Sequence, residues 1–238
     1  MLIFWRLLLG HLLADFTLQT DAINRWKRAS LRGMAVHCAI HLACYAALTY
    51  SYLGQVWVHA FGLGLPGWAC VLLVVVGHFL PDQWRASTIA ARHLADSTLL
   101  FLWDQCVHCA VIFAAIPVGL DAASAKLVPE AWTVLACLLV LVTHATTVLV
   151  YFVGKDLHGW PFPVGVEKYA AMAERLVLAL LFLVPGRAWA PLALAWLLTV
   201  GVVRSRRRLG FSWEGFGLGG GMAAVCGLLA RLVCYGGV

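Results

Sequence analysis

The sequence has little charge. Only 12% of its 238 residues are Asp, Glu, Lys or Arg, whereas soluble domains carry about 25%. Hydrophobic residues make up 63% of the chain, and its mean hydropathy is +0.88. So low a charged fraction excludes an ordinary soluble domain and indicates a membrane protein.

Several sequence motifs are also missing. There is no Walker loop, dinucleotide fingerprint or G-x-S-x-G elbow to suggest nucleotide or acyl-serine chemistry. The apolar segment 1–20 has no small-residue cleavage site and is interrupted by polar residues, so we expect a retained first helix and not a signal peptide. Most of the eight cysteines fall inside apolar segments, which favours small buried hydrophobes over a disulfide framework.

Long apolar segments are what the sequence has instead. A membrane-spanning helix needs about 20 mostly apolar residues. Eight segments meet this need: 1–20, 34–53, 67–86, 97–118, 127–152, 168–184, 188–203 and 214–235. The sequence predicts an all-α transmembrane bundle of eight spans, or seven if the sixth and seventh are one, with an interfacial turn at 54–67. Residues 1–118 would form one four-helix half and 119–238 a second half of the same membrane domain.

The positive charges predict the orientation. Most cations follow the first, third, fifth and seventh spans: Arg25, Lys27, Arg28, Arg32, Arg85, Arg92, Lys155, Lys168, Arg204, Arg206, Arg207 and Arg208. The other side holds Arg6, Lys126, Arg187 and Arg231. The positive-inside rule predicts a multi-pass inner (cytoplasmic) membrane protein with both termini outside. Topology and anionic lipid explain the net charge of +6 without a nucleic acid, and no protein partner is indicated.

Ionisable residues inside the spans repeat one spacing. Four pairs lie at i, i+4: His11 and Asp15, His37 and His41, His78 and Asp82, and Asp104 and His108. Because such residues are costly in lipid, they are functional candidates by default. A helix places each pair on one face, and the predicted topology puts all eight within roughly 5 to 20 Å of the cytoplasmic face. We therefore predict one polar cavity, although Pro81 would disturb the geometry of the third pair.

This residue set suits a metal. Imidazole and carboxylate ligands favour zinc, with iron or manganese as alternatives. Eight ligands exceed what one tetrahedral zinc needs, so either some support the ligands or two metals share the site. Asp15, Asp104 and Glu174 are candidate catalytic groups, and Gln19, Gln83, Gln105, His144 and Arg175 are candidates for orienting ligands or substrate. The alternative is that the pairs join helices by hydrogen bonds without a metal.

The motifs also resemble a known family. The patterns are H-x3-D-x3-Q at 11–19, H-x3-H at 37–41, H-x3-D at 78–82 and D-Q-x2-H at 104–108. Together they resemble the bacterial and phage membrane family known as domain of unknown function 3307, mainly over residues 8–115. The Glu-Arg-Leu at 174–176 is similar to a later helix of that family, in a weaker match over 165–185. The resemblance implies that the His and Asp set is a family feature and implies no activity.

Three functions fit these residues. The first is a metal-dependent hydrolase that acts on a lipid or lipid-linked substrate in the cytoplasmic leaflet. The second is a proton-coupled transporter or carrier with a His and Asp relay, although no inverted repeat is evident. A di-iron membrane oxidase is weaker, because only one H-x3-H motif occurs among the predicted ligands.

Overall fold

The computed structural model describes residues 1–60, 62–117, 127–207 and 212–236, most of them helical. The chain divides into two compact units, Met1–Thr133 and Val134–Val238. The boundary predicted between residues 118 and 119 lies outside the described residues.

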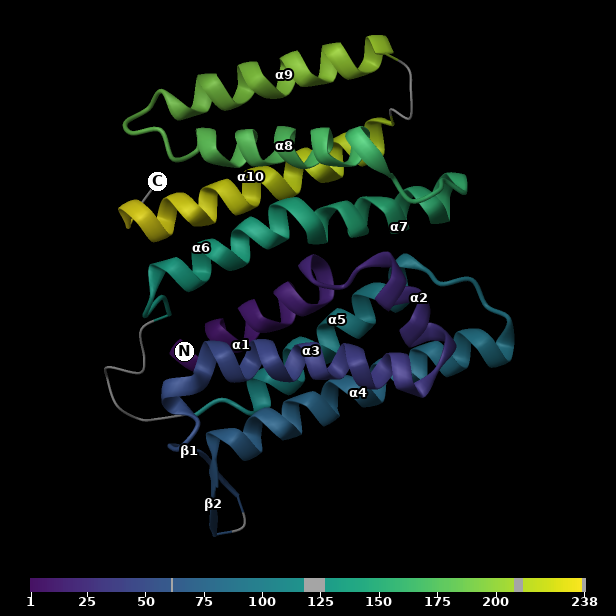
Figure 1. The fold of residues 1–238 in the computed structure, drawn as a ribbon. Helices are drawn as coiled ribbons and strands as arrows, with labels where there is room; N and C mark the ends of the chain where they lie inside the picture. Colours follow the sequence, from purple (N-terminus) through teal and green to yellow (C-terminus); the bar gives the residue numbers. More distant parts are fainter. Residues whose placement is uncertain (61, 118–126, 208–211, 237–238) are drawn as a thin grey trace. The chain divides into compact units, whose positions relative to one another are not determined.

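The first unit is a helical bundle (Figure 1). Its long helices are α1 (Leu2–Leu12), α3 (Leu31–Thr49), α4 (Gly67–Arg92) and α5 (Thr98–Ala114). Helix α1 packs against α3 and α5, while α4 packs against both α3 and α5. The core between them contains the fully buried side chains of Leu7, Tyr45, Val71 and Ile112. This packing brings the predicted ligand-bearing faces of the four helices together.

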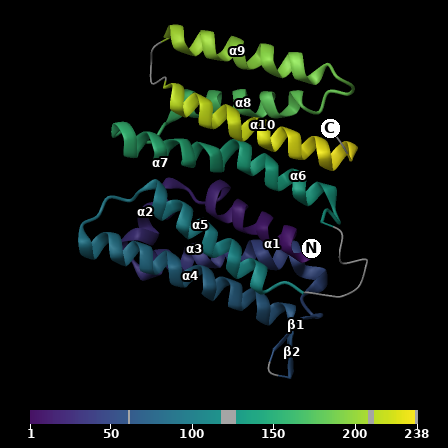
Figure 2. The ribbon, with the colours of Figure 1, turned by 180° about the vertical axis from the view of Figure 1, so that it is seen from behind.

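Two regions of this unit, one after α1 and one before α4, contain elements that were not predicted as such. Helix α1 continues into a π-helical turn, η1 (Leu13–Thr17), and the chain then bends by 93° into helix α2 (Asp21–Ala29). The predicted interfacial turn contains an antiparallel hairpin of β1 (Val56–Ala60) and β2 (Leu63–Pro66), which comes after the short 3₁₀ turn η2 (Tyr50–Tyr52). Figure 2 shows the hairpin at the N-terminal end of α4.

Local caps explain why α2 forms a separate helix. The Thr20 hydroxyl accepts a hydrogen bond from the backbone N–H of Ile23 at 3.3 Å and caps α2. Ser30 ends α2 and caps α3, since its hydroxyl accepts the N–H of Gly33 at 3.1 Å. A Cβ at Gly33 would lie 2.3 Å from the carbonyl oxygen of Trp26, so only glycine permits this tight corner.

The second unit is also helical. Helix α6 (Ala131–Val140), which begins just before the boundary, the π-helical turn η3 (Leu141–Ala145) and α7 (Thr146–His158) form one continuous segment. Helices α8 (Gly165–Leu181), α9 (Trp189–Arg207) and α10 (Trp213–Tyr235) come next in the chain, and α10 packs against α7 and α8. The Arg231 guanidinium of α10 donates to the carbonyls of Phe182, Val184 and Gly186 at 2.8 to 3.0 Å. It thereby supports the C-terminal end of α8.

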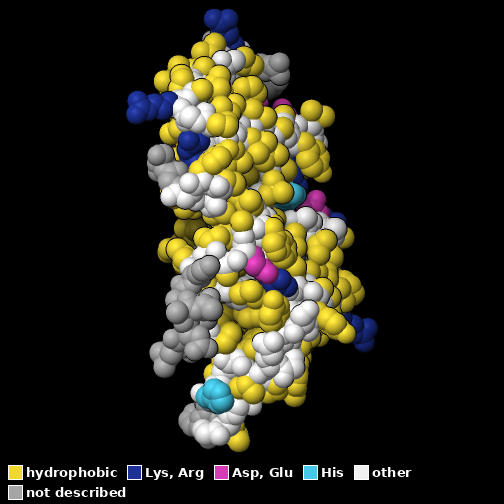
Figure 3. Space-filling model, turned by 90° about the vertical axis from the view of Figure 1, so that its left-hand side faces the viewer, with side chains coloured by type: hydrophobic (Ala, Val, Ile, Leu, Met, Phe, Trp, Pro, Cys, Tyr) yellow, Lys and Arg dark blue, Asp and Glu magenta, His cyan; other side chains and the backbone are white. Residues whose placement is uncertain are grey.

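Fewer membrane spans are supported than the eight predicted. Three described segments are long and apolar enough to cross a membrane: Leu31–Tyr52, Ala131–His158 and Trp213–Tyr235. The bent pair Leu2–Thr17 and Asp21–Ala29 would be a fourth. Helices α5 and α8 have 17 residues each, below the usual requirement of about 20. The surface is still rich in apolar side chains, as the face in Figure 3 shows.

Candidate metal centre

All eight predicted ligands meet inside Met1–Thr133. Their donor atoms form three overlapping groups, within each of which the atoms lie within 4.8 Å of one another. The groups are His11, Asp15, His78 and His108; Asp15, His37, His41 and His78; and Asp82, Asp104 and His108. Seven of the eight residues are buried, and the Asp15 side chain is 8% exposed. We call these eight residues the candidate metal centre.

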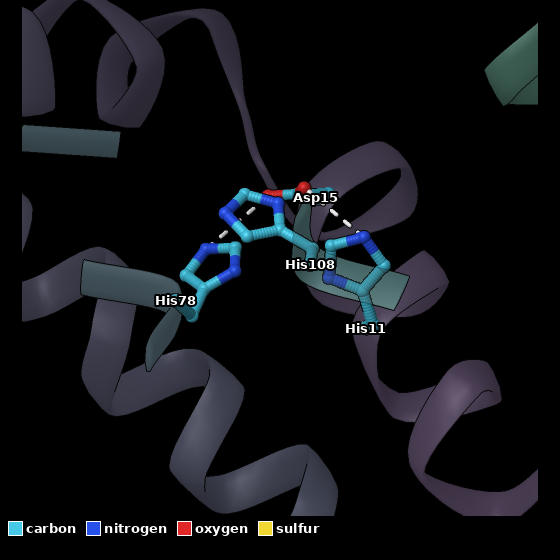
Figure 4. A group of neighbouring side chains, drawn as sticks. All are labelled: His11, Asp15, His78 and His108. Atoms are coloured by element: carbon cyan, nitrogen blue, oxygen red, sulfur yellow. Dashed lines mark ion pairs between the residues drawn. The ribbon is translucent and has the colours of Figure 1, made fainter. Parts of the chain in front are cut away.

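Asp15 lies at the middle of this centre, within η1. Its Oδ1 atom is 3.2 Å from Nε2 of both His37 and His41 and 3.9 Å from Nε2 of His78. Its Oδ2 atom is 3.6 Å from Nε2 of His11. Figure 4 shows Asp15 between His11 and His78, with His108 beside them. The two carboxylate oxygens thus face different histidines, and Asp15 would contribute to both of the His-rich ligand groups if a metal were bound.

The histidine rings lie close together, and several of their ring nitrogens have no hydrogen-bond partner. The ring centroid of His78 lies 3.7 Å from that of His41 and 4.0 Å from that of His108. Within the described part of the chain, Nδ1 of His11, of His37 and of His78 and both ring nitrogens of His108 are buried without a hydrogen-bond partner. Buried polar atoms normally have partners. Their number in one place indicates a site built for a further ligand.

Sequence reasoning missed the basic residues of this site, which it had used only for topology. Lys27 of α2 donates to Asp82 Oδ2 at 3.0 Å and lies 3.3 Å from His37 Nε2. Arg85 of α4 contacts Asp104 at 3.0 Å. Arg85 comes three residues after Asp82 on one helix, a spacing that could have revealed it. Nothing in the sequence near Lys27 signalled its role, because the contact depends on the bend before α2.

A second carboxylate outside the predicted set completes this network. Asp96, just before α5, accepts from Arg85 at 2.7 Å and from Arg28 of α2 at 2.8 Å. It therefore links α2 and α4 to the segment that leads into α5.

Asp15 differs from the other carboxylates of this region in having no Lys or Arg partner among the described residues. Asp82, Asp96 and Asp104 each contact a Lys or Arg side chain. Among the described residues, the partners of Asp15 are histidines and Gln105 only. A buried carboxylate needs a compensating cation. A protonated histidine or a divalent cation would supply that charge here, and imidazole and carboxylate are a donor set that a divalent cation fits.

The predicted supporting glutamines differ in their surroundings. Gln105 Oε1 lies 3.2 Å from His11 Nε2, and its amide nitrogen donates to Asp104 at 3.3 Å and to Asp15 at 3.5 Å. Gln83 instead donates to Ser87 on its own helix. Oε1 of Gln19 is buried without a partner among the described residues. An unpredicted hydroxyl, Tyr45 OH, lies 3.3 Å from His41 Nδ1 and fixes that ring.

Pro81 does not separate the pair that flanks it. Helix α4 is continuous through Pro81, and His78 Nε2 lies 3.6 Å from Asp82 Oδ2. The i, i+4 contact therefore survives the proline.

Three other predicted site residues belong to Val134–Val238. The Glu174 carboxylate accepts from Nε of Arg204 at 2.7 Å. Arg175 donates to the carbonyls of Val142 and Thr143. His144 Nδ1 lies 3.1 Å from the hydroxyl of Thr143. Each of them has partners within its own unit.

These observations define a class: a helical protein with membrane-capable helices and a buried cluster of histidines and carboxylates. A model of the family described as "Protein of unknown function (DUF3307)" matches residues 3–135, more than half of the chain, and the chain belongs to this family. The match contains every residue of the candidate metal centre. Comparison with the curated proteins and comparison with the solved structures each gave no match.

Proposed function

We propose that this protein is an integral membrane metalloprotein, and that it hydrolyses a lipid or lipid-linked substrate at the cytoplasmic leaflet. The observation that carries the proposal is Asp15, a buried carboxylate with no Lys or Arg partner among the described residues, whose contacts include four histidines. Zinc is the preferred metal for imidazole and carboxylate ligands, with iron or manganese as alternatives. A bound zinc ion polarises a carbonyl or phosphoryl oxygen and activates water near neutral pH.

Individual residues have distinct roles in this proposal. Asp15 and the histidines that face it, His11, His37, His41 and His78, are the primary ligands. Asp104 is the general base, because Arg85 holds its Oδ2 while its Oδ1 is buried without a hydrogen-bond partner among the described residues. Gln105 orients both His11 and Asp104. Glu174 is given no role in this proposal, because its contact is the ion pair with Arg204 in the second unit; its predicted catalytic role stays a prediction.

The proposed location of the site rests on topology. In the predicted eight-span topology, the positive-inside rule favours a cytoplasmic position for α2 and the C-terminal end of α4 in the inner membrane, with both termini outside. Lys27, Arg28 and Arg85 come from these two elements. A substrate in the cytoplasmic leaflet would then have the shortest path to the candidate metal centre.

A second function is favoured by one observation. Lys27 Nζ, His37 Nε2 and His78 Nε2 form a continuous chain, with steps of 3.3 and 3.1 Å. Two ring nitrogens at such a distance share one proton, as in a relay. A proton-coupled carrier would use this chain without any metal.

Metal analysis separates the two functions. The full chain is purified in mild detergent without chelators, and its zinc, iron and manganese are measured per mole of protein. We expect about one or two equivalents of metal in the wild type, because one site or two bridged sites are available. Asp15→Asn and His41→Ala each alter a proposed primary ligand and should lower metal affinity by more than the roughly 10-fold to 100-fold that loss of a supporting partner costs.

Asp21→Asn is the matched control, since Asp21 is an exposed carboxylate on α2. It should keep the metal content of the wild type, and thermal melts establish that each variant is folded. A wild type without metal, combined with proton flux in liposomes that His37→Ala abolishes, would favour the relay. If neither metal nor flux is found, the cluster only joins helices, and both functions are wrong.

A further inference from the structure

A pocket lies within Val134–Val238, between α7, α8, α9 and α10. It has a volume of about 410 Å3, within the usual range for small-molecule sites. Aromatic side chains make up much of its wall: Tyr151, Trp160, Phe162, Trp196 and Phe216. Such a wall suits an apolar chain or ring.

The charged groups of the pocket do not cancel. Lys168, Arg175 and Arg204 line it together with Glu167 and Glu174. Glu174 and Arg204 neutralise each other through their 2.7 Å ion pair. The Lys168 ammonium lies 5.2 Å from the centroid of the Phe162 ring, a cation–π contact that keeps it over the aromatic wall.

Arg175 is the fixed cation of this pocket. Its Nε atom donates to the Val142 carbonyl and its Nη2 atom to the Thr143 carbonyl, both at 3.0 Å, and Nη2 also donates to the Thr147 hydroxyl. Both carbonyls belong to η3, where the π-helical pattern replaces the normal i, i+4 bonds. These contacts hold the guanidinium in one orientation.

One side of that guanidinium stays available. No carboxylate pairs with Arg175 and no acceptor bonds its Nη1 atom among the described residues. Gly219 of α10 leaves room beside it, because a Cβ there would lie 3.3 Å from Arg175 Cδ and 3.9 Å from Nη1. A partly buried arginine with free donors is a recognition element for carboxylate or phosphate.

We propose that this pocket binds a single-chain anionic amphiphile, with a carboxylate or phosphate head on Nη1 of Arg175 and an apolar tail along the aromatic wall. A choline-type cation is disfavoured because three basic and two acidic side chains leave the pocket with a net positive charge. The inference goes beyond the proposed hydrolase and does not depend on the candidate metal centre.

Native mass spectrometry of the full chain tests this proposal. The protein, released from mild detergent, is titrated with oleate, with oleoyl lysophosphatidate and with oleoyl lysophosphatidylcholine. We expect one saturable equivalent of oleate or lysophosphatidate, and the stronger of the two identifies the head group. Lysophosphatidylcholine should bind at least about tenfold more weakly, because it brings its own cation to Arg175.

Three variants test whether the anionic probe binds at Arg175 in this pocket. Arg175→Gln should weaken binding of the anionic probe by at least about tenfold, and Ala171→Phe should block the pocket while keeping the charge of Arg175. Arg206→Gln, an exposed residue on α9 with the same charge change, should bind like the wild type. If Arg175→Gln does not fold, Ala171→Phe decides.

Two results would overturn the proposal: no saturable binding of either anionic probe, or equal binding by wild type and Ala171→Phe. Preference for lysophosphatidylcholine would do the same. Repeating the titration after chelator treatment separates this site from the metal, since anion binding should persist.

Discussion

Lys27 occupies a position beside two of the predicted metal ligands, Asp82 and His37. Its ammonium, 12% exposed, binds Asp82, whose carboxylate is 4% exposed, and it also contacts His37. A divalent cation near His37 would be repelled by this charge, yet without a metal the same charge compensates Asp82. In the proposed metalloprotein, we therefore expect Lys27 to stabilise the metal-free state and to weaken metal binding.

Lys27→Met should separate these two effects. Removing one partner of a buried pair leaves an uncompensated charge and typically costs about 3 to 5 kcal/mol, so the chelator-treated variant should melt well below the wild type. Added zinc should restore more stability to the variant than it adds to the wild type, because Asp82 becomes available. Thermal melts with and without zinc measure both differences.

Arg25→Met provides the matched control for Lys27→Met. Arg25 is an exposed cation on the same helix, and its loss should leave the melts unchanged. An Lys27→Met protein that melts like the wild type in chelator would show that Asp82 does not depend on Lys27.

Site residues that share a helix face could be predicted from the sequence. Residues that reach the site through a bend or a connecting segment could not. The i, i+4 spacing of Asp104 and His108 depends only on the helix period, so it could be read directly. Lys27 reaches Asp82 because the chain turns by 93° before α2, and that bend results from local caps and packing. Asp96 lies in a connecting segment, where no periodicity marks it.

At the scale of elements, the approach of α1 to α3 depends on one glycine. A Cβ at Gly10 would lie 2.8 Å from Cδ1 of the fully buried Tyr45. The next residue, His11, and the residue one turn before Tyr45, His41, have ring centroids 5.6 Å apart. The packing at Gly10 and the geometry of the candidate metal centre are therefore coupled.

Gly10→Ala should strain this contact. Overpacking of a core usually costs about 1 to 3 kcal/mol, so we expect a lower melting temperature and a lower metal content, since α1 must shift from α3. Gly54→Ala is the control, because nothing lies within 4 Å of a Cβ there. Unchanged melting and metal content in Gly10→Ala would mean that Tyr45 can move aside freely.

The elements themselves were predicted unevenly. Long apolar segments gave α3, α4, α5 and α10 almost at their observed positions, because hydrophobicity over about 20 residues is a strong signal. The β1–β2 hairpin was hidden in a Gly- and Pro-rich segment of low periodicity. Hydrophobicity alone also predicted more spans than the length and composition of the described helices support.

For the whole molecule, the number of spans decides where the termini lie. An even number, such as the predicted eight or the four that include the bent pair Leu2–Thr17 and Asp21–Ala29, puts both termini on one side. Three spans would put them on opposite sides. The positive-inside rule favours both outside.

Reporter fusions measure this directly. Alkaline phosphatase fused after the C-terminus should be active and green fluorescent protein dark there, because the C-terminus is expected outside. The same reporters inserted after Arg92, a predicted cytoplasmic connection, should give the opposite pattern and serve as the internal control. Fluorescence at the C-terminus would contradict the predicted orientation.

The π-helical turn η1 makes the length of this segment as important as its composition. Such a turn accommodates one residue more than an α-helical turn, and Asp15 sits inside it. Deleting Leu13 or Ala14 would shorten the spacing of His11 and Asp15 from i, i+4 to i, i+3 and move Asp15 by about 100° around the helix relative to His11. Conservative substitutions here keep that spacing, whereas a single-codon deletion would take Asp15 away from the histidines that it contacts. Insertions and deletions at this turn are thus expected to disturb the candidate metal centre more than conservative substitutions do.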